Sequence, residues 1–253
     1  MIPEWNRQRS DNLIMLINIF SSICSSVWLR MLILGVLCLM LSIPALAHGV
    51  AQGDASFIET AIGAQLLPFT YLGAKHMVTG YDHLLFLVGV IFFLHRLKEV
   101  SLYVTLFALG HSTTLLFGVL SGTEINAWLV DAIIGLSVVY KALDNLNAYP
   151  QWFGLQPDAR FAVLIFGFFH GFGLATKLQD FSLSEDGLIP NILAFNVGVE
   201  IGQLLALTGI LIVMNLWRRT ASFNRLAVWA NGALMTAGFV LMGYQLTGYW
   251  ITI

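Results

Sequence analysis

Residues 189–215 read IPNILAFNVGVEIGQLLALTGILIVMN, with one charged residue, Glu200, among mostly apolar side chains. A transmembrane α-helix needs about 20 consecutive, predominantly apolar residues, so this stretch is long enough to cross a bilayer. The whole chain has the same character, because 58% of its 253 residues are hydrophobic and 10% are charged. Soluble domains carry about 25% charged residues, and the sequence therefore predicts a membrane protein.

Apolar stretches of similar length follow one another along most of the chain. They predict six transmembrane helices, at about residues 79–96, 100–120, 127–147, 161–179, 189–215 and 225–248. Residues 57–77 predict an amphipathic or partly embedded helix on the outer side, within an outer segment at 48–78. We therefore expect an all-α fold, a polytopic membrane helix bundle that forms a single domain over residues 79–253.

The N-terminal region has the features of a signal peptide. Arg30 precedes an apolar run at 31–43, and the tripeptide Ala45-Leu46-Ala47 follows as an A-x-A cleavage site. We expect residues 1–47 to be removed, although an uncleaved anchor is the alternative. Cleavage would expose His48, whose α-amine and imidazole form a speculative N-terminal metal ligand. Both cysteines precede residue 47, so the mature protein would contain no thiol.

Basic residues predict the orientation of the helices. With the mature N-terminus outside, the first, third and fifth connections face the cytoplasm. These connections and the adjoining helix ends hold seven basic residues, Arg96, Lys98, Lys141, Arg160, Arg218, Arg219 and Arg225. The outer segments hold only Lys75 and Lys177. Because cytoplasmic loops are enriched in Lys and Arg, this distribution favours both mature termini lying outside.

The stretch KHMVTGYDH at residues 75–83 places ionisable groups at the start of the first span. His76 and His83 are seven residues apart, so a continuous helix carries both on one face. Asp82 lies beside His83. Imidazole and carboxylate groups at this spacing suit a divalent cation that prefers nitrogen and oxygen ligands. The alternative is a polar collar at the membrane surface, where water solvates these side chains.

Three further ionisable residues, His111, His170 and Glu200, lie along the second, fourth and fifth spans. A charged side chain at the centre of a membrane helix costs roughly 2.5–3.5 kcal/mol on insertion scales, so such groups face the bundle interior and find partners. On the expected topology these residues and His83 occupy one layer in the outer half of the membrane. This layer predicts one buried metal site, with the ligands His76, Asp82, His83, His111, His170 and Glu200.

Other polar side chains within the spans are candidates to support that site. They are Ser112, Asn196, Gln203, Asp131, Asp144 and Asn145. Asn196 and Gln203 share a stripe with Glu200, at positions i, i+7 and i+4 of one helix. A hydroxyl such as that of Ser112 can instead bond the preceding helical turn. The two aspartates lie near the ends of the third span, where solvation also explains them.

Five blocks of the sequence match a known family in the same order. They are KHMVTGYDHLLFL (75–87), ALGHSTTL (108–115), GLSVVYKALDN (135–145), FGFFHGFGLA (166–175) and FNVGVEIGQL (195–204). The sequence resembles the HupE/UreJ family of bacterial membrane proteins, in particular its broader second branch. The resemblance implies a signal peptide followed by six transmembrane helices. We expect a place in the bacterial inner membrane, with both mature termini periplasmic, as the distribution of basic residues indicates. For the better-known branch, the resemblance implies secondary transport of nickel or cobalt linked to hydrogenase and urease.

Two motifs, HPxxGxDH and FHGxAHGxE, describe that better-known branch. The first is nearly kept at residues 76–83, with Met77 in place of proline. The second is half kept, because Phe169-His170-Gly171 is followed by Gly173-Leu174-Ala175 where a second histidine and a glutamate are expected. Glu200 on the next helix is our candidate for the missing carboxylate.

We therefore expect a permease for a divalent transition metal ion, with nickel or cobalt as cargo and zinc or copper as alternatives, rather than an enzyme. An intramembrane zinc-dependent hydrolase would use the same cluster, with Glu200 or Asp82 as general base, although no HExxH motif favours it. A non-transporting assembly or sensory partner is a third reading, and the short connections leave little surface for it. No run of Lys and Arg predicts nucleic-acid binding, so the expected partners are the lipid bilayer and the metal ion.

Overall fold

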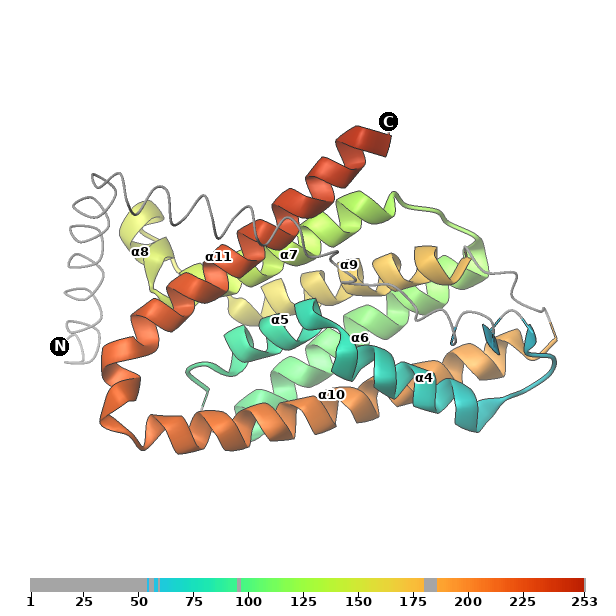
Figure 1. Ribbon diagram of the computed structural model, residues 1–253, viewed down its shortest axis with the longest axis horizontal. Coiled ribbons are helices and arrows are strands. Elements are labelled where there is room, and N and C mark those ends of the chain that lie inside the picture. Colours follow the sequence, from blue (N-terminus) through green and yellow to red (C-terminus); the bar gives the residue numbers. More distant parts are fainter. Residues whose placement is uncertain (1–53, 55–56, 59, 95–96, 180–185, 253) are drawn as a thin grey trace.

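The computed structural model describes residues 54, 57–58, 60–94, 97–179 and 186–252. Within these ranges the fold is all-α, as expected, and contains eight numbered helices (Figure 1). They are α4 (Leu66–Thr79), α5 (Tyr81–Ile91), α6 (Leu97–Ser121), α7 (Ala127–Asn145), α8 (Ala148–Phe153), α9 (Ala159–Gln179), α10 (Leu188–Arg218) and α11 (Ala221–Thr252). The predicted signal peptide and His48 lie outside the described residues.

Four of the described helices are long and apolar enough to cross a membrane. They are α6, α9, α10 and α11, the last two with 31 and 32 residues. Helix α7 has 19 residues and carries Asp131, Lys141 and Asp144, which lower its apolar character. Helix α5 is apolar but has only 11 residues, which is about 16 Å at 1.5 Å per residue, so it is too short to cross alone.

The first predicted span differs from the helix that the structure contains. A continuous helix was expected over residues 79–96, but α4 ends at Thr79 and α5 occupies only Tyr81–Ile91. Between them Gly80 has φ −72° and ψ 107°, which is an extended conformation that ends one helix and begins the next. The break lies next to Asp82 and His83, so it decides how these side chains are presented.

Two helix pairs run in the same direction and touch at glycines. In the α4–α10 pair, Gly73 and Gly198 pack so closely that a Cβ atom on either would overlap the backbone of the other helix. In the α6–α9 pair, Gly110 and Gly167 each leave 2.5 Å between such a Cβ atom and a backbone oxygen of the partner helix. Small residues allow this close approach in membrane bundles, where lipid supplies no hydrophobic drive for helix association. Figure 1 shows α4 lying against α10 along one edge of the bundle.

The third pair, α7 with α11, runs in opposite directions. A Cβ atom on Gly135 would lie 2.6 Å from the Met242 nitrogen, and Trp128 fills the space beside Gly248. At the other end, Asn145 donates from Nδ2 to the Asn231 Oδ1 at 2.9 Å and to the Gly89 carbonyl oxygen at 2.8 Å. These two hydrogen bonds tie α7 to both α11 and α5.

Arg218 joins the end of α10 to the end of α5. Its guanidinium donates to the carbonyl oxygens of Ile91, at 2.5 Å, and Phe92, at 2.9 Å. The last carbonyls of a helix have no partner within the helix. An arginine placed there satisfies them, and its positive charge interacts favourably with the negative end of the helix dipole. The end of the bundle that holds Arg218 also holds α8, and we call it the α8 end (Figure 1).

Candidate functional site

The break at Gly80 brings the two histidines of the 75–83 stretch together. The ring centres of His76, on α4, and His83, on α5, lie 5.1 Å apart with an edge-on orientation. A Cβ atom on Gly80 would lie 2.5 Å from the His83 Nδ1 and 3.1 Å from the Asp82 Oδ1. Only glycine therefore leaves room for both side chains beside the helix break.

Asp82 and His83 form a buried pair inside the bundle. The His83 Nδ1 lies 3.0 Å from the Asp82 Oδ1, and the residues are 1% and 2% exposed. An ionised carboxylate only accepts hydrogen bonds, so Nδ1 carries the proton and Nε2 carries the lone pair in the neutral ring. A carboxylate orients metal-binding histidines in this way and makes the other nitrogen a better ligand.

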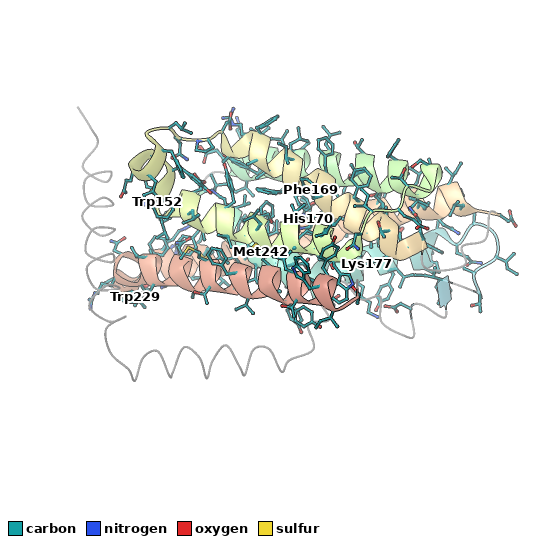
Figure 2. The ribbon with its side chains drawn as sticks, turned by 90° about the horizontal axis from the view of Figure 1, so that it is seen from above. Trp152, Phe169, His170, Lys177, Trp229 and Met242 are labelled. Atoms are coloured by element: carbon teal, nitrogen blue, oxygen red, sulfur yellow. The ribbon has the colours of Figure 1, made fainter. Side chains whose placement is uncertain are left out.

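His170, on α9, extends the group to a third helix. Its ring centre lies 5.0 Å from that of His83, and the residue is 1% exposed. Its Nδ1 donates to the carbonyl oxygen of Phe166, one turn earlier, at 2.8 Å. Because a carbonyl oxygen cannot donate, this bond also places the lone pair on Nε2. Figure 2 shows His170 within the bundle, between Trp152 and Trp229 at one end and Lys177 towards the other.

His111, on α6, is fully buried next to this group. Its ring stacks on Phe107 with centres 6.1 Å apart, and the same Phe107 meets the His170 ring at 4.9 Å. Neither ring nitrogen of His111 has a hydrogen-bond partner within the part of the chain that the structure describes. The backbone of His111 also touches Gly171, so α6 and α9 carry their histidines at the same level.

His83 makes one ring contact with His76 and another with His170, and the described histidines do not form a closed metal site. Within the described ranges, no three His, Cys, Asp or Glu side chains converge closely enough to hold one metal ion. Two imidazoles bound to one metal have ring centres about 5 Å apart, because each metal–nitrogen bond is about 2.1 Å long. The observed separations of 5.0 and 5.1 Å match that spacing for each contacting pair.

The expected polar stripe on α10 is divided between the inside and the outside of the chain. Asn196 is 6% exposed and Gln203 is 0% exposed, and neither side-chain amide makes a hydrogen bond to another described residue. Glu200, about 40° further round the helix, is exposed. The structure therefore buries four of the six predicted ligands, Asp82, His83, His111 and His170, leaves His76 half-buried, and places Glu200 at the edge.

The remaining supporting residues lie in three different places. The Lys177 ammonium on α9 lies 2.7 Å from the Asp131 carboxylate on α7 and forms an ion pair with it, further from the α8 end than the histidines. Asp144 pairs with Lys141 and accepts a hydrogen bond from Gln156, near the α8 end, where Asn145 makes the bonds described above. Ser112 is half-buried on α6 beside His111. Asp131, Asp144 and Asn145 thus have structural partners of their own.

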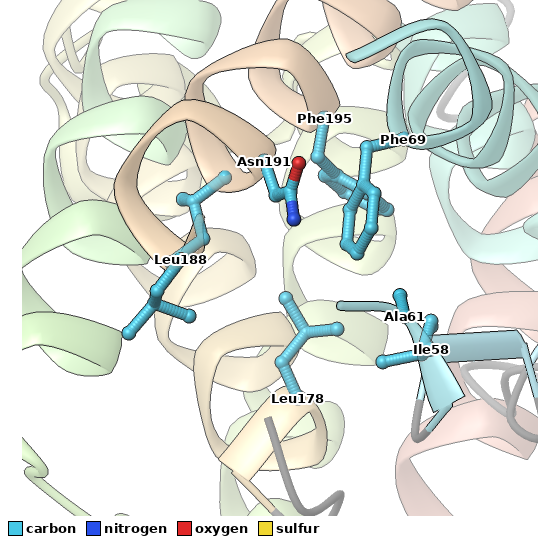
Figure 3. A pocket seen from close by; sticks show the side chains of 8 residues that line it. Ile58, Ala61, Phe69, Leu178, Leu188, Asn191 and Phe195 are labelled. Carbon is cyan, nitrogen blue, oxygen red and sulfur yellow. The ribbon is translucent and has the colours of Figure 1, made fainter. Parts of the chain in front are cut away.

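A small pocket lies on the other side of His76 from the helix break. It has a volume of about 20 Å³, and Figure 3 shows Phe69, Asn191 and Phe195 among the side chains that line it. The Phe195 ring lies 6.1 Å from the His76 ring, so one aromatic side chain separates the pocket from the histidines. Asn191 accepts from the Gln65 backbone N–H at 2.6 Å and donates to the Gly63 carbonyl oxygen at 3.0 Å.

Sequence reasoning did not identify Phe86, Phe107 or Phe195 as neighbours of the histidines. A phenylalanine in a span looks the same in sequence whether it faces lipid or a buried imidazole. Asn191 and Arg218 carried a usable signal, because polar side chains at the ends of spans often cap neighbouring helices.

Comparison with known proteins supplies the family. A search of curated proteins and a search of solved structures found no match. The model of the family described as HupE / UreJ protein matches residues 52–253, which include all eight numbered helices and all six candidate ligands. On this match, the chain belongs to the HupE/UreJ family and is a multi-pass membrane protein.

Proposed function

We propose that this protein is an inner-membrane permease for a divalent transition metal ion, with nickel or cobalt as its cargo. The observation that carries the proposal is the chain of contacts from the buried Asp82 and His83 to the half-buried His76 and the buried His170. The association of the HupE/UreJ family with nickel and cobalt transport supports the same cargo.

The first of six crossings in this proposal is the broken helix α4–α5. The backbone N–H of Gln65, before α4, donates to Asn191 near the start of α10, and Arg218 at the end of α10 reaches the end of α5. The two short helices therefore follow α10 along its length. Counted together with Gly80 they rise about 39 Å, more than the roughly 30 Å of a bilayer core.

Helix α7 forms another crossing, although its charged residues make it less apolar than the other spans. It follows α11 from Gly248, beside Trp128, to Asn231, beside Asn145. That distance along α11 is about 26 Å, so α7 traverses nearly the whole core. Its charged residues are paired within the protein, which lowers the cost of placing them in a membrane helix.

The chemistry of the cluster suits a borderline metal ion. Imidazole nitrogen binds nickel, copper and zinc well, and a carboxylate adds charge. The hydrogen bonds from the Nδ1 atoms of His83 and His170 direct both Nε2 lone pairs to metal binding. His76 and His111 complete the proposed ligand group, and Glu200 is retained as a ligand that α10 would have to rotate inwards.

Transport requires these ligands to close on the ion and then release it. Metal ligands must give up their protons, so binding releases protons and acidification promotes release. A site assembled from pairwise contacts on α4, α5, α6 and α9 changes its ligand number when those helices move. We infer that this is how the cation is handed through the bundle, with Asn196 and Gln203 as supporting polar groups.

Metal uptake and metal binding test the proposal together. Cells without other nickel importers should accumulate radioactive nickel or cobalt when they express the protein. The purified protein should bind the same ion. His170→Phe keeps a ring against Phe86 and Phe107 but removes both nitrogens, and it should lower uptake and affinity by about tenfold or more. The proposal fails if the unaltered protein neither binds nor transports nickel, cobalt, zinc or copper.

A further inference from the structure

A second polar position lies on the α8 side of the histidine cluster, at Gln203. The side chain is fully buried on α10, and both its amide oxygen and its amide nitrogen lack hydrogen-bond partners among the described residues. An amide can donate two hydrogen bonds and accept two. Leaving such a group buried and unsatisfied costs about 1–3 kcal/mol, so its presence in a folded protein requires an explanation.

Gln203 borders a small cavity between four helices. The cavity has a volume of about 10 Å³, and its other lining residues include Phe86 and Val90 on α5, Tyr103 and Phe107 on α6, and Val163 on α9. A space of this size holds about one water molecule. A hydrated divalent cation does not fit, so the passage is closed on this side in the conformation described.

Two aromatic rings separate this cavity from the histidines. Phe86 and Phe107 are 1% and 2% exposed, and their ring centres lie 5.6 Å apart. Both also meet the ring of His170, at 5.8 and 4.9 Å. The same two side chains line the cavity on their other side. A cation leaving the histidines towards the α8 end must therefore displace this aromatic pair.

We propose that Gln203 is a second binding position for the permeating cation, reached when Phe86 and Phe107 swing aside. Its amide oxygen replaces one water ligand of a partly hydrated divalent cation that has left the histidines. Apart from the weakly coordinating hydroxyl of Tyr103, the described lining residues around it are apolar, so the cation is held weakly and moves on. This inference rests on the proposed transport function and assigns the inward half of its path.

Separate measurements of binding and transport test this role. Gln203→Leu removes the amide, and the matched control is Gln245→Leu, another buried glutamine, on α11 and outside the cavity lining. With nickel as the probe, Gln203→Leu should keep the equilibrium affinity of the histidine cluster within about twofold. Its initial uptake rate in proteoliposomes should fall by about tenfold or more, equivalent to roughly 1.4 kcal/mol in the barrier. Gln245→Leu should change neither.

Two results would overturn the inference while leaving the proposed function intact. One is uptake by Gln203→Leu within about twofold of the unaltered protein, because a binding position on the path cannot be dispensable. The other is a parallel loss of affinity and uptake, which would assign Gln203 to the histidine site itself. Failure of the unaltered protein to bind and transport nickel would instead overturn the proposed function.

Thiol labelling provides a test that does not depend on the leucine variant. Gln203→Cys is made in a background where Cys24 and Cys38, the only two cysteines, are serine. Adding Phe107→Ala should accelerate reaction of the new thiol with a small cationic methanethiosulfonate by about tenfold or more, and nickel should slow it. Unchanged labelling after removal of the Phe107 ring would contradict the proposed aromatic barrier.

Discussion

At the scale of single residues, the Asp82–His83 contact constrains the site most closely. The carboxylate fixes which nitrogen of His83 carries the proton, and it brings the negative charge nearest to that ring. Because both side chains are buried, the field of the carboxylate is less screened than it would be at a surface. The pair therefore combines orientation and charge in one contact.

Replacing Asp82 by asparagine removes the negative charge but keeps the size and shape of the side chain. We expect Asp82→Asn to fold normally but to bind nickel or cobalt about 10–100-fold more weakly, since partners of metal-binding histidines contribute about that much affinity. Isothermal titration of the purified protein measures the change. Asp158→Asn is the control, because Asp158 is exposed at the start of α9 and should leave affinity unchanged. Equal affinities for Asp82→Asn and the unaltered protein would contradict the role of Asp82.

The sequence was informative about individual polar residues and silent about their apolar neighbours. His76, His83, His111 and His170 were identifiable because imidazoles are rare and expensive inside membrane spans. The outward position of Glu200 was not predictable. A helical stripe spanning about 60° includes both buried and edge positions, and the boundary depends on which helices pack alongside α10.

At the scale of helices, the glycine contacts determine how closely the histidine-bearing helices approach. Gly171 follows His170 in sequence, and a Cβ atom there would overlap the His111 carbonyl oxygen and the Thr114 hydroxyl. Thr114 itself donates to the Phe168 carbonyl oxygen at 2.8 Å, which joins α6 and α9 at the same level. A larger residue at 171 must push the two helices apart.

Gly171→Ala should destabilise the protein by about 1–3 kcal/mol, the usual cost of overpacking an interior. The thermal unfolding midpoint in detergent should fall, and nickel affinity should fall with it because α6 and α9 carry His111 and His170. Gly209→Ala is the matched control, since a Cβ atom on Gly209 meets no atom of the described residues within 4 Å. Equal midpoints for the two alanine variants would show that the α6–α9 contact is not tight.

The long spans were predictable to within a few residues, but the helix expected at 57–77 was wrong at its start, because residues 61–65 are not helical and α4 begins at Leu66. Hydropathy located α6, α9, α10 and α11 because each is a long apolar segment. It merged residues 79–96 into one span, because the 11 residues of α5 are apolar and nothing in composition marks them as half of a broken crossing. The extended conformation of Gly80 is a change in backbone dihedral angles, which hydropathy does not record.

At the scale of the whole molecule, the distribution of basic residues makes a prediction about orientation. Alkaline phosphatase, which is active only outside the cytoplasm, should be active when fused after Ile253. It should be inactive when fused after Leu155, in the exposed connection between α8 and α9. The reason is the excess of Lys and Arg on the side of that connection. The reverse pattern of activities would invert the proposed orientation and the direction of the path.

The glycine-packed pairs also determine what moves when the site opens. His76 belongs to the α4–α10 pair, and His111 and His170 belong to the α6–α9 pair, while His83 meets both His76 and His170 across the boundary. Pairs held together by backbone contact shift as rigid units, because packed interiors do not deform smoothly. A sliding of one pair past the other by a few ångströms would therefore divide the ligands into two groups at once. Affinity for the transported ion would be lost in a single step. The displacement that opens the passage would therefore also release the ion from its ligands.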